Sequence, residues 1–175
     1  MQNIDKDAVI LPILISCVDN NFSRQIMHDF FTSMKQIVYI DAGNESVNVP
    51  SDWQERAKED WTEEELQAYK ESGWSGQVVT GIKFVDYYQA PLAELHPEVL
   101  EDMDTIQAPS SLSCTELTAS EPQRVIVNKF AALAITNIVQ EIFEEWTVTN
   151  HTVLFHAKKS YMRGIPRIEK ELSYR

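Results

Sequence analysis

The sequence predicts an α/β fold in which a short parallel sheet is covered by helices. A nearly unbroken apolar run at residues 8–18 gives way to helical spacing from Asn21, and a second apolar run follows at 37–40. Strand, helix and strand in this order indicate a βαβ unit with a right-handed crossover. Further along, residues 125–143 are apolar over much of the helix circumference, which is typical of a helix buried against a sheet or a second subunit.

The run at 8–18 predicts a strand buried on both faces, as in a parallel sheet with helices on either side. Pro12 cannot donate a hydrogen bond to a neighbouring strand, so we expect the paired part to begin after it. The helix that follows has Asn20 or Asn21 as its natural N-cap. One face of this helix carries a stripe of apolar side chains, namely Phe22, Ile26, Met27, Phe30, Phe31 and Met34.

The second strand, at 37–40, ends in Asp41-Ala-Gly-Asn44. Residues 45–75 are rich in acidic side chains with tryptophans spaced among them, which predicts an acidic helical insertion of one or two short amphipathic helices. Two roles stay open for this insertion. It is either a surface lid that packs its aromatic side chains on the edge of the domain, or a segment that binds a partner.

A third strand is predicted at 76–84, followed by a proline-punctuated acidic loop without periodicity at 86–112. Loops of this length inside a domain are often functional. For the long helix, Ser120 and Gln123 form a capping-box pattern, and Pro122 falls in the first turn, where its missing N–H does no harm.

The C-terminal part predicts a β-hairpin, with strands at 151–156 and 161–165 on either side of residues 158–160. The pattern contains no internal repeat and no low-complexity tract. We therefore interpret residues 1–175 as a single domain that carries one insertion.

The balance of charges excludes several classes of function. With 15 basic and 27 acidic side chains, the 175-residue chain has a net charge of −12. It lacks the basic face that nucleic-acid binding needs, and an anionic membrane surface is an equally poor partner. Two cysteines are too few for a disulfide framework or a four-cysteine zinc site. Because no apolar run is long enough to span a bilayer and the acidic N-terminus does not have the pattern of a secretory signal, we expect a cytoplasmic protein.

Polar residues follow the first strand, at the edge where open α/β sheets bind ligands. Asp19, Asn20 and Arg24 stand there. A carboxylate in that position can hold Mg²⁺ on the phosphates of a nucleotide, because this cation prefers oxygen ligands. The alternative is that Asp19 or Asn20 only caps the helix.

Cys114, in a polar loop ahead of the long helix, is a candidate nucleophile, since a helix N-terminus favours the thiolate form. Glu116 and Glu121 oppose this effect, and an inert loop cysteine is the alternative. Cys17, inside the apolar run, is expected to be a small core residue. None of the four histidines has a spacing suited to a metal site.

Several short segments follow one another in a recognisable order: Cys17-Val-Asp-Asn20 with Arg24, Tyr39-Ile-Asp-Ala-Gly-Asn44, Ser75-Gly-Gln-Val-Val-Thr-Gly81, Leu95-His-Pro-Glu98, Ser113-Cys-Thr115, Glu121-Pro-Gln123, Asn128-Lys-Phe-Ala-Ala132 and the terminal hairpin. In this order and spacing they resemble the ThiF/MoeB/HesA family, the prokaryotic relatives of ubiquitin-activating enzymes. The nearest pattern is that of the ThiF-like proteins of the bacterial PRTRC gene system. The resemblance covers nearly the whole chain outside 45–75.

The resemblance implies a Rossmann-like adenylating enzyme of the ThiF type. Such enzymes use ATP and Mg²⁺ to attach AMP to the C-terminal carboxylate of a ubiquitin-like or sulfur-carrier protein. Asp19 matches the position that holds Mg²⁺–ATP, and Asn20 and Arg24 belong to the same block of the family. Cys114 aligns with the cysteine that, in many members, takes the activated acyl group as a thioester or persulfide. We also expect a homo- or hetero-oligomer.

Two features of the family are absent from these 175 residues. The nucleotide-binding half, with its Gly-x-Gly-x-x-Gly loop and phosphate-binding arginine and lysine residues, normally precedes the strand found here at 8–18, and the five glycines do not reproduce that spacing. The Cys-x-x-Cys pairs of zinc-binding relatives are missing too, so no zinc is expected. The resemblance thus covers a partial fold, the C-terminal half, which should bind ATP poorly by itself.

Three hypotheses remain open. The chain is either one half of an adenylating enzyme, completed by a separate nucleotide-binding half, or a non-catalytic relative that keeps the carrier-protein and dimer surfaces as a binding module. The third is a structural protein, encoded by a plasmid or phage, whose acidic insertion docks a partner.

Overall fold

The structure is a computed structural model that describes residues 10–101 and 122–166. Its six strands form one sheet in the order β1-β2-β3-β5-β6, and β4 pairs with β3 beside this path. The elements, in chain order, are β1 (Ile13–Ser16), α1 (Asn21–Ser33), β2 (Ile37–Asn44), η1 (Lys58–Asp60), α2 (Glu63–Glu71), β3 (Ser75–Phe84), β4 (Tyr87–Gln89), α3 (Leu92–Leu95), α4 (Glu98–Glu101), α6 (Val125–Glu145), β5 (Asn150–His156), η3 (Ala157–Lys159) and β6 (Tyr161–Pro166).

The sheet is mixed, and its parallel part is the pair β1 and β2, with Ile13 opposite Val38. The other pairings, β2–β3, β3–β4, β3–β5 and β5–β6, are antiparallel. β3 runs antiparallel to β2 because the insertion returns to the place where it left the sheet: the Glu45 N–H donates to the Ser75 carbonyl oxygen at 2.9 Å. The predicted α/β fold and its βαβ unit are therefore confirmed, within a sheet that is otherwise antiparallel.

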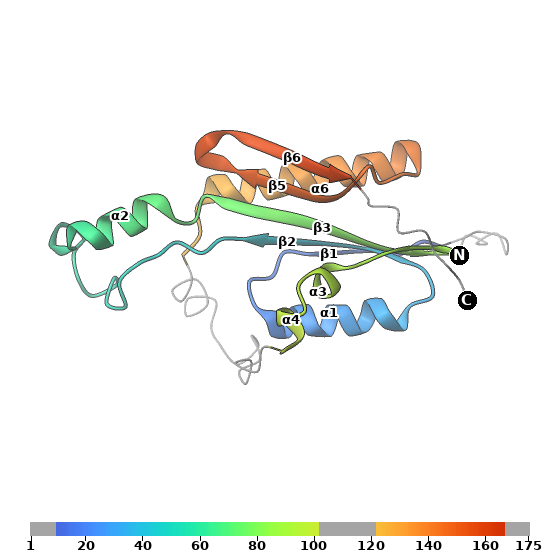
Figure 1. The fold of residues 1–175 in the computed structure, drawn as a ribbon, viewed down its shortest axis with the longest axis horizontal. Coiled ribbons are helices and arrows are strands. Elements are labelled where there is room, and N and C mark those ends of the chain that lie inside the picture. The colour runs from blue at the N-terminus through green and yellow to red at the C-terminus, as the bar shows by residue number, and fades with distance from the viewer. Residues whose placement is uncertain (1–9, 102–121, 167–175) are drawn as a thin grey trace, which may run out of the picture.

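Helices cover both faces of this sheet (Figure 1). α6 lies across β2, β3 and β5 on one face, and α1, α3 and α4 lie on the other. The side chains of β2 alternate between the two layers: Val38 and Ile40 enter the core under α6, whereas Ile37 and Tyr39 pack with Phe31 of α1. One strand thereby supplies both cores.

The first strand is shorter and more exposed than the sequence predicts. β1 begins directly after Pro12, as expected, and the Pro12 carbonyl oxygen accepts a hydrogen bond from the Val38 N–H at 2.9 Å. The prediction of burial on both faces is wrong, because Ile15 is 45% exposed. β1 is the edge strand of the described sheet, and α6 packs on β2, β3 and β5, further in.

The helix after β1 has the predicted N-cap but buries less of its stripe than predicted. The Asn20 side-chain oxygen accepts a hydrogen bond from the Ser23 N–H at 2.8 Å. Phe31 is fully buried, whereas Ile26 and Phe30 are exposed. α1 packs on the four-residue helices α3 and α4, which are too small to cover the whole stripe.

Three short elements replace the irregular loop predicted at 86–112, of which the structure describes residues up to 101. These are β4, α3 and α4. Pro91 caps the start of α3, and it packs closely on β3, where a Cβ on Gly81 would lie 2.8 Å from the Pro91 Cα atom. Helices of four residues are too short to show a periodicity, which is why the sequence pattern missed them.

α6 confirms the predicted long helix but starts later than predicted. It begins at Val125 with Arg124 at the N-cap, so the pattern at Ser120, which lies outside the described residues, is not its capping box. By length and composition α6 is the one helix in the described ranges that could cross a membrane. Its buried side chains pack on the sheet, as in the covering helix of a core: Val127, Ala131, Ala134, Ile138 and Ile142.

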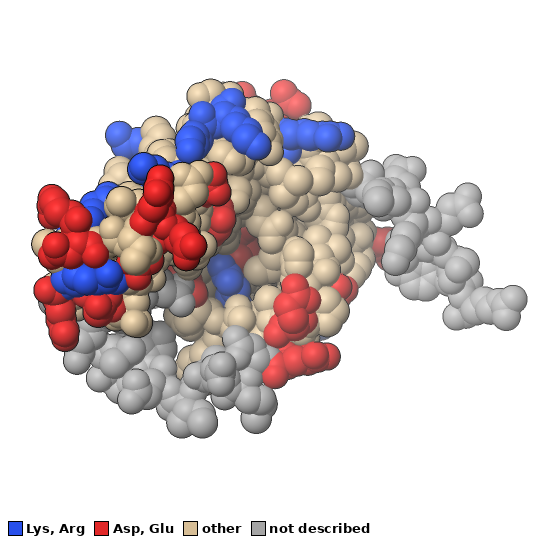
Figure 2. Space-filling view, turned by 60° about the vertical axis from the view of Figure 1, so that its left-hand side comes forward, with Lys and Arg blue, Asp and Glu red and all other residues tan. Residues whose placement is uncertain are grey.

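The insertion contains the two short helices that the sequence predicts, η1 and α2, and it projects from the sheet as an arm (Figure 1). Thr62 and Glu65 form a capping box at the start of α2. Figure 2 shows acidic side chains gathered over this arm, while lysine and arginine side chains lie along the top of the molecule.

Stacked cations and aromatic rings hold the arm against the rest of the fold. The Arg124 guanidinium lies 4.9 Å from the ring centre of Tyr69 and 4.0 Å from that of Trp74. Its Nε atom also donates a hydrogen bond to the Ser72 carbonyl oxygen at 3.1 Å. Lys158 of the hairpin contacts the opposite end of this stack, 5.6 Å from the Trp74 ring centre. These contacts support the lid interpretation of the insertion, in which its aromatic side chains pack on the edge of the domain.

β5 and β6 confirm the predicted hairpin. Ser160, at φ 52°, makes the turn between η3 and β6 in the left-handed region. β6 is exposed along its whole length and forms the second edge of the described sheet. Lysines at such an edge discourage pairing with other chains, and Lys158 and Lys159 stand at its turn.

Replacing Arg124 tests the stacked contacts. Arg124→Ala removes two cation–π contacts and the hydrogen bonds to the carbonyl oxygens of Ser72 and Tyr69, so we expect the free energy of unfolding to fall by about 2 kcal/mol in urea denaturation. Arg56→Ala is the matched control, because Arg56 pairs with Asp52 and Glu65 on the surface of the same arm. Exposed ion pairs contribute little, so this variant should stay close to the parent chain. An equal loss in both variants would contradict the prediction.

Candidate functional site

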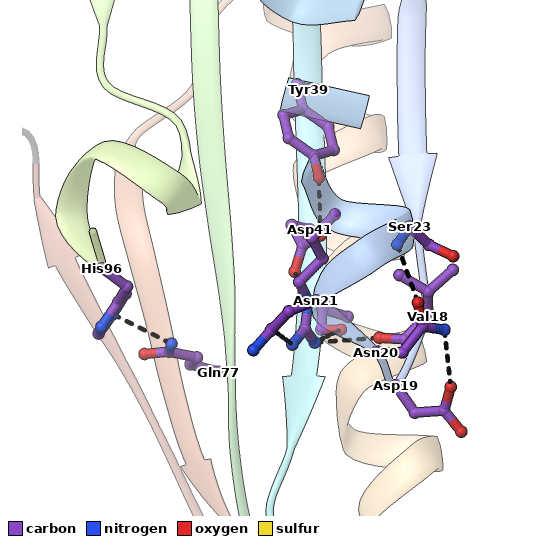
Figure 3. A network of polar contacts seen from close by, with 11 residues as sticks. Val18, Asp19, Asn20, Asn21, Ser23, Tyr39, Asp41, Gln77 and His96 are labelled. Atoms are coloured by element: carbon purple, nitrogen blue, oxygen red, sulfur yellow. Dashed lines mark hydrogen bonds and ion pairs between the residues drawn. The ribbon is translucent and has the colours of Figure 1, made fainter. Parts of the chain in front are cut away.

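The candidate site lies at the C-terminal ends of the neighbouring parallel strands β1 and β2. Asp19 and Asn20 follow β1, Asp41 of β2 lies opposite Ser16, the last residue of β1, and Asn44 ends β2. The Asn20 amide nitrogen donates to the Asp19 carboxylate at 3.4 Å, while its oxygen caps α1 (Figure 3). Capping is therefore the role of Asn20, and the exposed Asp19 carboxylate remains available beyond the strand end.

Arg24 connects the two strand ends to α1. Its Nη2 atom donates to the carbonyl oxygens of Val18 at 3.0 Å and Ala42 at 3.5 Å. Its Nη1 atom donates to the Asn21 side-chain oxygen at 3.4 Å, and its Nε atom lies 3.3 Å from a carboxylate oxygen of Asp41. Both Nη atoms thus donate hydrogen bonds inside the protein and the Nε atom lies within ion-pair distance of Asp41, which makes Arg24 a support of the site wall.

Asp41 is the buried charge that Arg24 offsets. Its side chain is 1% exposed, and its second oxygen accepts a hydrogen bond from the Tyr39 hydroxyl at 2.8 Å. Burial raises the pKa of the Asp41 carboxyl above its usual range, and the positive charge of Arg24 acts in the opposite direction. Burial, together with the charge of Asp41, also raises the pKa of Tyr39, so this phenol keeps its proton.

The sequence analysis did not single out Asp41 as a site residue. The available signal is the pair Asp41 and Gly43 at the end of an apolar strand. A Cβ atom on Gly43 would lie 3.1 Å from the Arg24 Nη2 atom, so the glycine leaves room for the guanidinium to lie against β2.

A cavity of about 330 Å³, here called the site cavity, opens between these strand ends and α6. Asp19 and Cys17 line it from β1, and the small side chains of Ala131 and Ala132 leave space on the side of α6. Across the cavity the Asn44 amide donates to the Asn128 side-chain oxygen at 2.7 Å, which links β2 to α6. The walls therefore combine apolar side chains with side-chain amides, one carboxylate and the Arg24 guanidinium.

Cys17 is not the core residue that the sequence predicts. It is a free, exposed cysteine on the wall of the site cavity, because it follows the last paired residue of an edge strand. Partial burial raises the pKa of the Cys17 thiol, and the negative charge of Asp41 raises it further. A protonated thiol is a poor nucleophile, so Cys17 is a wall of the cavity at neutral pH.

The site cavity offers one carboxylate to a magnesium ion and few groups to a triphosphate. The Asp19 carboxylate can supply one hard oxygen ligand, and Mg²⁺ usually takes the others from phosphates and water. Within residues 10–101 and 122–166, no three His, Cys, Asp or Glu side chains are grouped as a metal site. The Ser23 N–H at the start of α1 is taken by Asn20, and Arg24 is engaged with Asp41, so cations and N–H groups for the phosphates must come from elsewhere.

A second cavity of about 520 Å³ lies on the other side of Arg24, next to α3 and α4. Here the His96 Nδ1 atom lies 3.1 Å from a carboxylate oxygen of Glu98. Its Nε2 atom lies 3.3 Å from the Gln77 amide nitrogen (Figure 3). Because an amide nitrogen donates, this geometry corresponds to the tautomer with the proton on Nδ1. The Leu95–Glu98 segment of the resemblance therefore borders this cavity, while Cys114 lies outside the described residues.

The comparisons with known proteins add no relative to this description. No model of a protein family matches the chain, and no curated protein matches it significantly. The resemblance to the ThiF family consequently depends on the segments quoted above, and the function is inferred from these segments and from the geometry of the site.

The buried ion pair makes the stability of the fold depend on pH in a defined way. Arg24→Ala leaves the Asp41 carboxylate buried without its cation, so we expect the free energy of unfolding at neutral pH to fall by about 3–5 kcal/mol. Without Arg24 the pKa of folded Asp41 rises further, whereas in the unfolded chain it keeps its ordinary value of 3.8. The folded state then binds a proton more readily than the unfolded state, so the loss caused by the substitution shrinks as the pH falls through the raised pKa.

Urea denaturation at a series of pH values measures this effect. The double variant Arg24→Ala/Asp41→Asn is the control: it carries no buried charge, so it should be more stable than Arg24→Ala at neutral pH and lack the pH-dependent recovery. A loss in Arg24→Ala that stays constant from neutral to acidic pH would show that Asp41 does not depend on Arg24.

Proposed function

We propose that this chain is the C-terminal half of a ThiF-like adenylating enzyme, which activates the C-terminal carboxylate of a ubiquitin-like or sulfur-carrier protein with ATP and Mg²⁺. The observation that carries the proposal is the position of Asp19. It is an exposed carboxylate at the C-terminal end of β1, next to a parallel strand and on the wall of the site cavity. Ligands of open α/β sheets bind at this edge.

In this proposal each residue of the site has a separate task. Asp19 holds the magnesium ion, Asn20 fixes the turn into α1, and Arg24 keeps the two strand ends together through Asp41. The amides of Asn44 and Asn128 offer hydrogen bonds to a polar substrate in the cavity. When bound, Mg²⁺–ATP supplies an electrophilic α-phosphorus and a pyrophosphate leaving group for the attacking carboxylate. Cys114 is the proposed acceptor of the acyl group.

The proposal requires a second, nucleotide-binding half, because the described residues contain no cradle for the phosphates. The edge of β1 supports its attachment there: β1 is the edge strand of the described sheet, and Ile10 and Ile15 are exposed beside it. An open edge strand with exposed apolar side chains favours association with another strand and its helices. An assembly of this kind would be a hetero-oligomer located in the cytoplasm, in keeping with the acidic, cysteine-poor composition.

A non-catalytic binding module is the second candidate, and one observation favours it. The Arg24 guanidinium, which the resemblance places in the nucleotide-binding block, hydrogen-bonds through both Nη atoms inside the protein and forms an ion pair with Asp41. A chain that had lost nucleotide binding would keep such contacts, because they stabilise the fold. Binding of ATP and Mg²⁺ therefore separates the two candidates.

Nuclear magnetic resonance of the labelled chain tests the role of Asp19. If the proposal is correct, ATP at millimolar concentration with Mg²⁺ shifts the amide signals of residues 17–20 and Asn128, and removal of Mg²⁺ with a chelator weakens these shifts. Asp19→Asn should abolish the magnesium dependence, because the amide cannot replace the charge of the carboxylate. Asp29→Asn, on the exposed surface of α1, is the control and should leave the shifts unchanged. Shifts that are the same for both variants would disprove the role of Asp19. The absence of any shift would support the binding module only if it persists when a candidate nucleotide-binding partner is added, because this half should bind ATP poorly by itself.

A further inference from the structure

An apolar cavity of about 320 Å³ opens at the end of the fold opposite to the candidate site. It lies where α6 ends and where β2 begins, and we call it the α6-end cavity. Its walls are mainly apolar: Leu11, Val38, Ile82, Phe84, Ile142 and Val148. These side chains belong to the main core or pack against it, so the cavity is a place where the core opens to the surface.

Trp146, which lines this cavity, and Val85, which directly follows Phe84 of its wall, both have an unfavourable backbone conformation. Both have a positive φ, 53° for Trp146 and 51° for Val85, and both are 79% exposed. A β-branched or bulky residue is rare in the left-handed region, because its Cβ atom crowds the backbone. Glycine or asparagine would avoid this cost, so the folded state by itself gives no reason for valine and tryptophan here.

Two more exposed apolar residues are next in the chain to residues that line the cavity. Ile10 precedes Leu11, and Phe143 follows Ile142. Ile10, Val85, Phe143 and Trp146 together form what we call the apolar rim. An exposed apolar patch around a concave apolar cavity is typical of a surface that binds another protein.

Acidic side chains accompany the apolar rim. Asp86 follows Val85, and Glu144 and Glu145 lie between Phe143 and Trp146; all three are exposed. The lysine of the same strand, Lys83, is turned away, since its ammonium group donates to carbonyl oxygens at the end of α1. The surroundings of the cavity are therefore apolar at the centre and negative at the margin.

We propose that the α6-end cavity is the docking site for an amphipathic helix of a partner protein, with a bulky apolar side chain that enters the cavity and basic residues beside it. A helix can place one large side chain in the cavity and further apolar side chains, three and four residues away, on Phe143 and Trp146. Its lysine or arginine residues then lie opposite Asp86, Glu144 and Glu145. The site is separate from Asp19 and does not depend on the proposed adenylation.

Fluorescence anisotropy with a labelled synthetic peptide tests the proposal. The probe is an amphipathic helix of about five turns, with leucine and one tryptophan on one face and lysine on the other. The full chain should bind it, and the affinity should fall as salt is added, because the margin of the site is charged. A peptide with glutamate in place of every lysine should bind at least about tenfold more weakly. Equal binding of the two peptides, or no binding of the basic peptide, would overturn the proposal.

Substitutions on the protein separate docking from stability. Val85→Asn and Trp146→Asn remove apolar surface and also relieve the positive φ, so each should weaken peptide binding about tenfold or more while the melting temperature stays equal or rises. Leu133→Gln, an exposed position elsewhere along α6, is the matched control and should bind the peptide like the parent chain. Unchanged binding in both asparagine variants would overturn the proposal whatever their melting temperatures.

A second copy of this chain is the competing occupant, and sedimentation of the parent chain tests it. A monomer at the concentrations used for the peptide supports the partner helix. A dimer that Trp146→Asn converts to monomer would mean that the chain covers this surface with its own copy, and the proposal would be wrong.

Discussion

The buried contact between Arg24 and Asp41 is the constraint on which the candidate site depends. It joins three elements that are otherwise separate, since Arg24 belongs to α1, Asp41 to β2, and the Val18 carbonyl oxygen to the end of β1. A carboxylate as buried as Asp41 costs several kcal/mol if it is left without a partner, on the order of 3–5. The fold therefore holds the two strand ends in one arrangement, and Asp19 obtains its position as a consequence.

This constraint also limits what the resemblance to adenylating enzymes can establish. Arg24, Asp41 and Gly43 all belong to the segments that carry the resemblance, and the structure explains each of them by contacts inside the protein. Asn20 is explained in the same way, as the cap of α1. Asp19 is different, because it is exposed. Its carboxylate accepts a hydrogen bond of 3.4 Å from the side-chain amide of Asn20, the next residue in the chain. The contacts of the fold do not account for Asp19, so the proposed function depends on this residue above the others.

The sequence predicted those parts of the fold that have a regular period or a local signal. The βαβ unit, the cap at Asn20 and the helix over 125–143 follow from such patterns, and the structure confirms them. It could not show that Ile15 is exposed, because burial of a strand depends on what lies beside it in space. The same reason applies to Cys17. It was predicted to be buried in the core, but it is exposed because it follows an edge strand. Asp41 was missed because its partner is 17 residues away, on a different element.

α6 connects the two ends of the molecule, yet the fold favours independent sites. Asn128 and Ala131 border the site cavity, whereas Ile142 and Trp146 border the α6-end cavity. A helix of 21 residues is about 32 Å long. Binding at one cavity could therefore affect the other through α6 only if the helix moved as a rigid body. Buried side chains along the whole helix hold it against three strands, β2, β3 and β5, and such a movement would have to disrupt that packing. Two separate surfaces on one rigid scaffold would let the chain bind the proposed ligand and the proposed partner independently of each other.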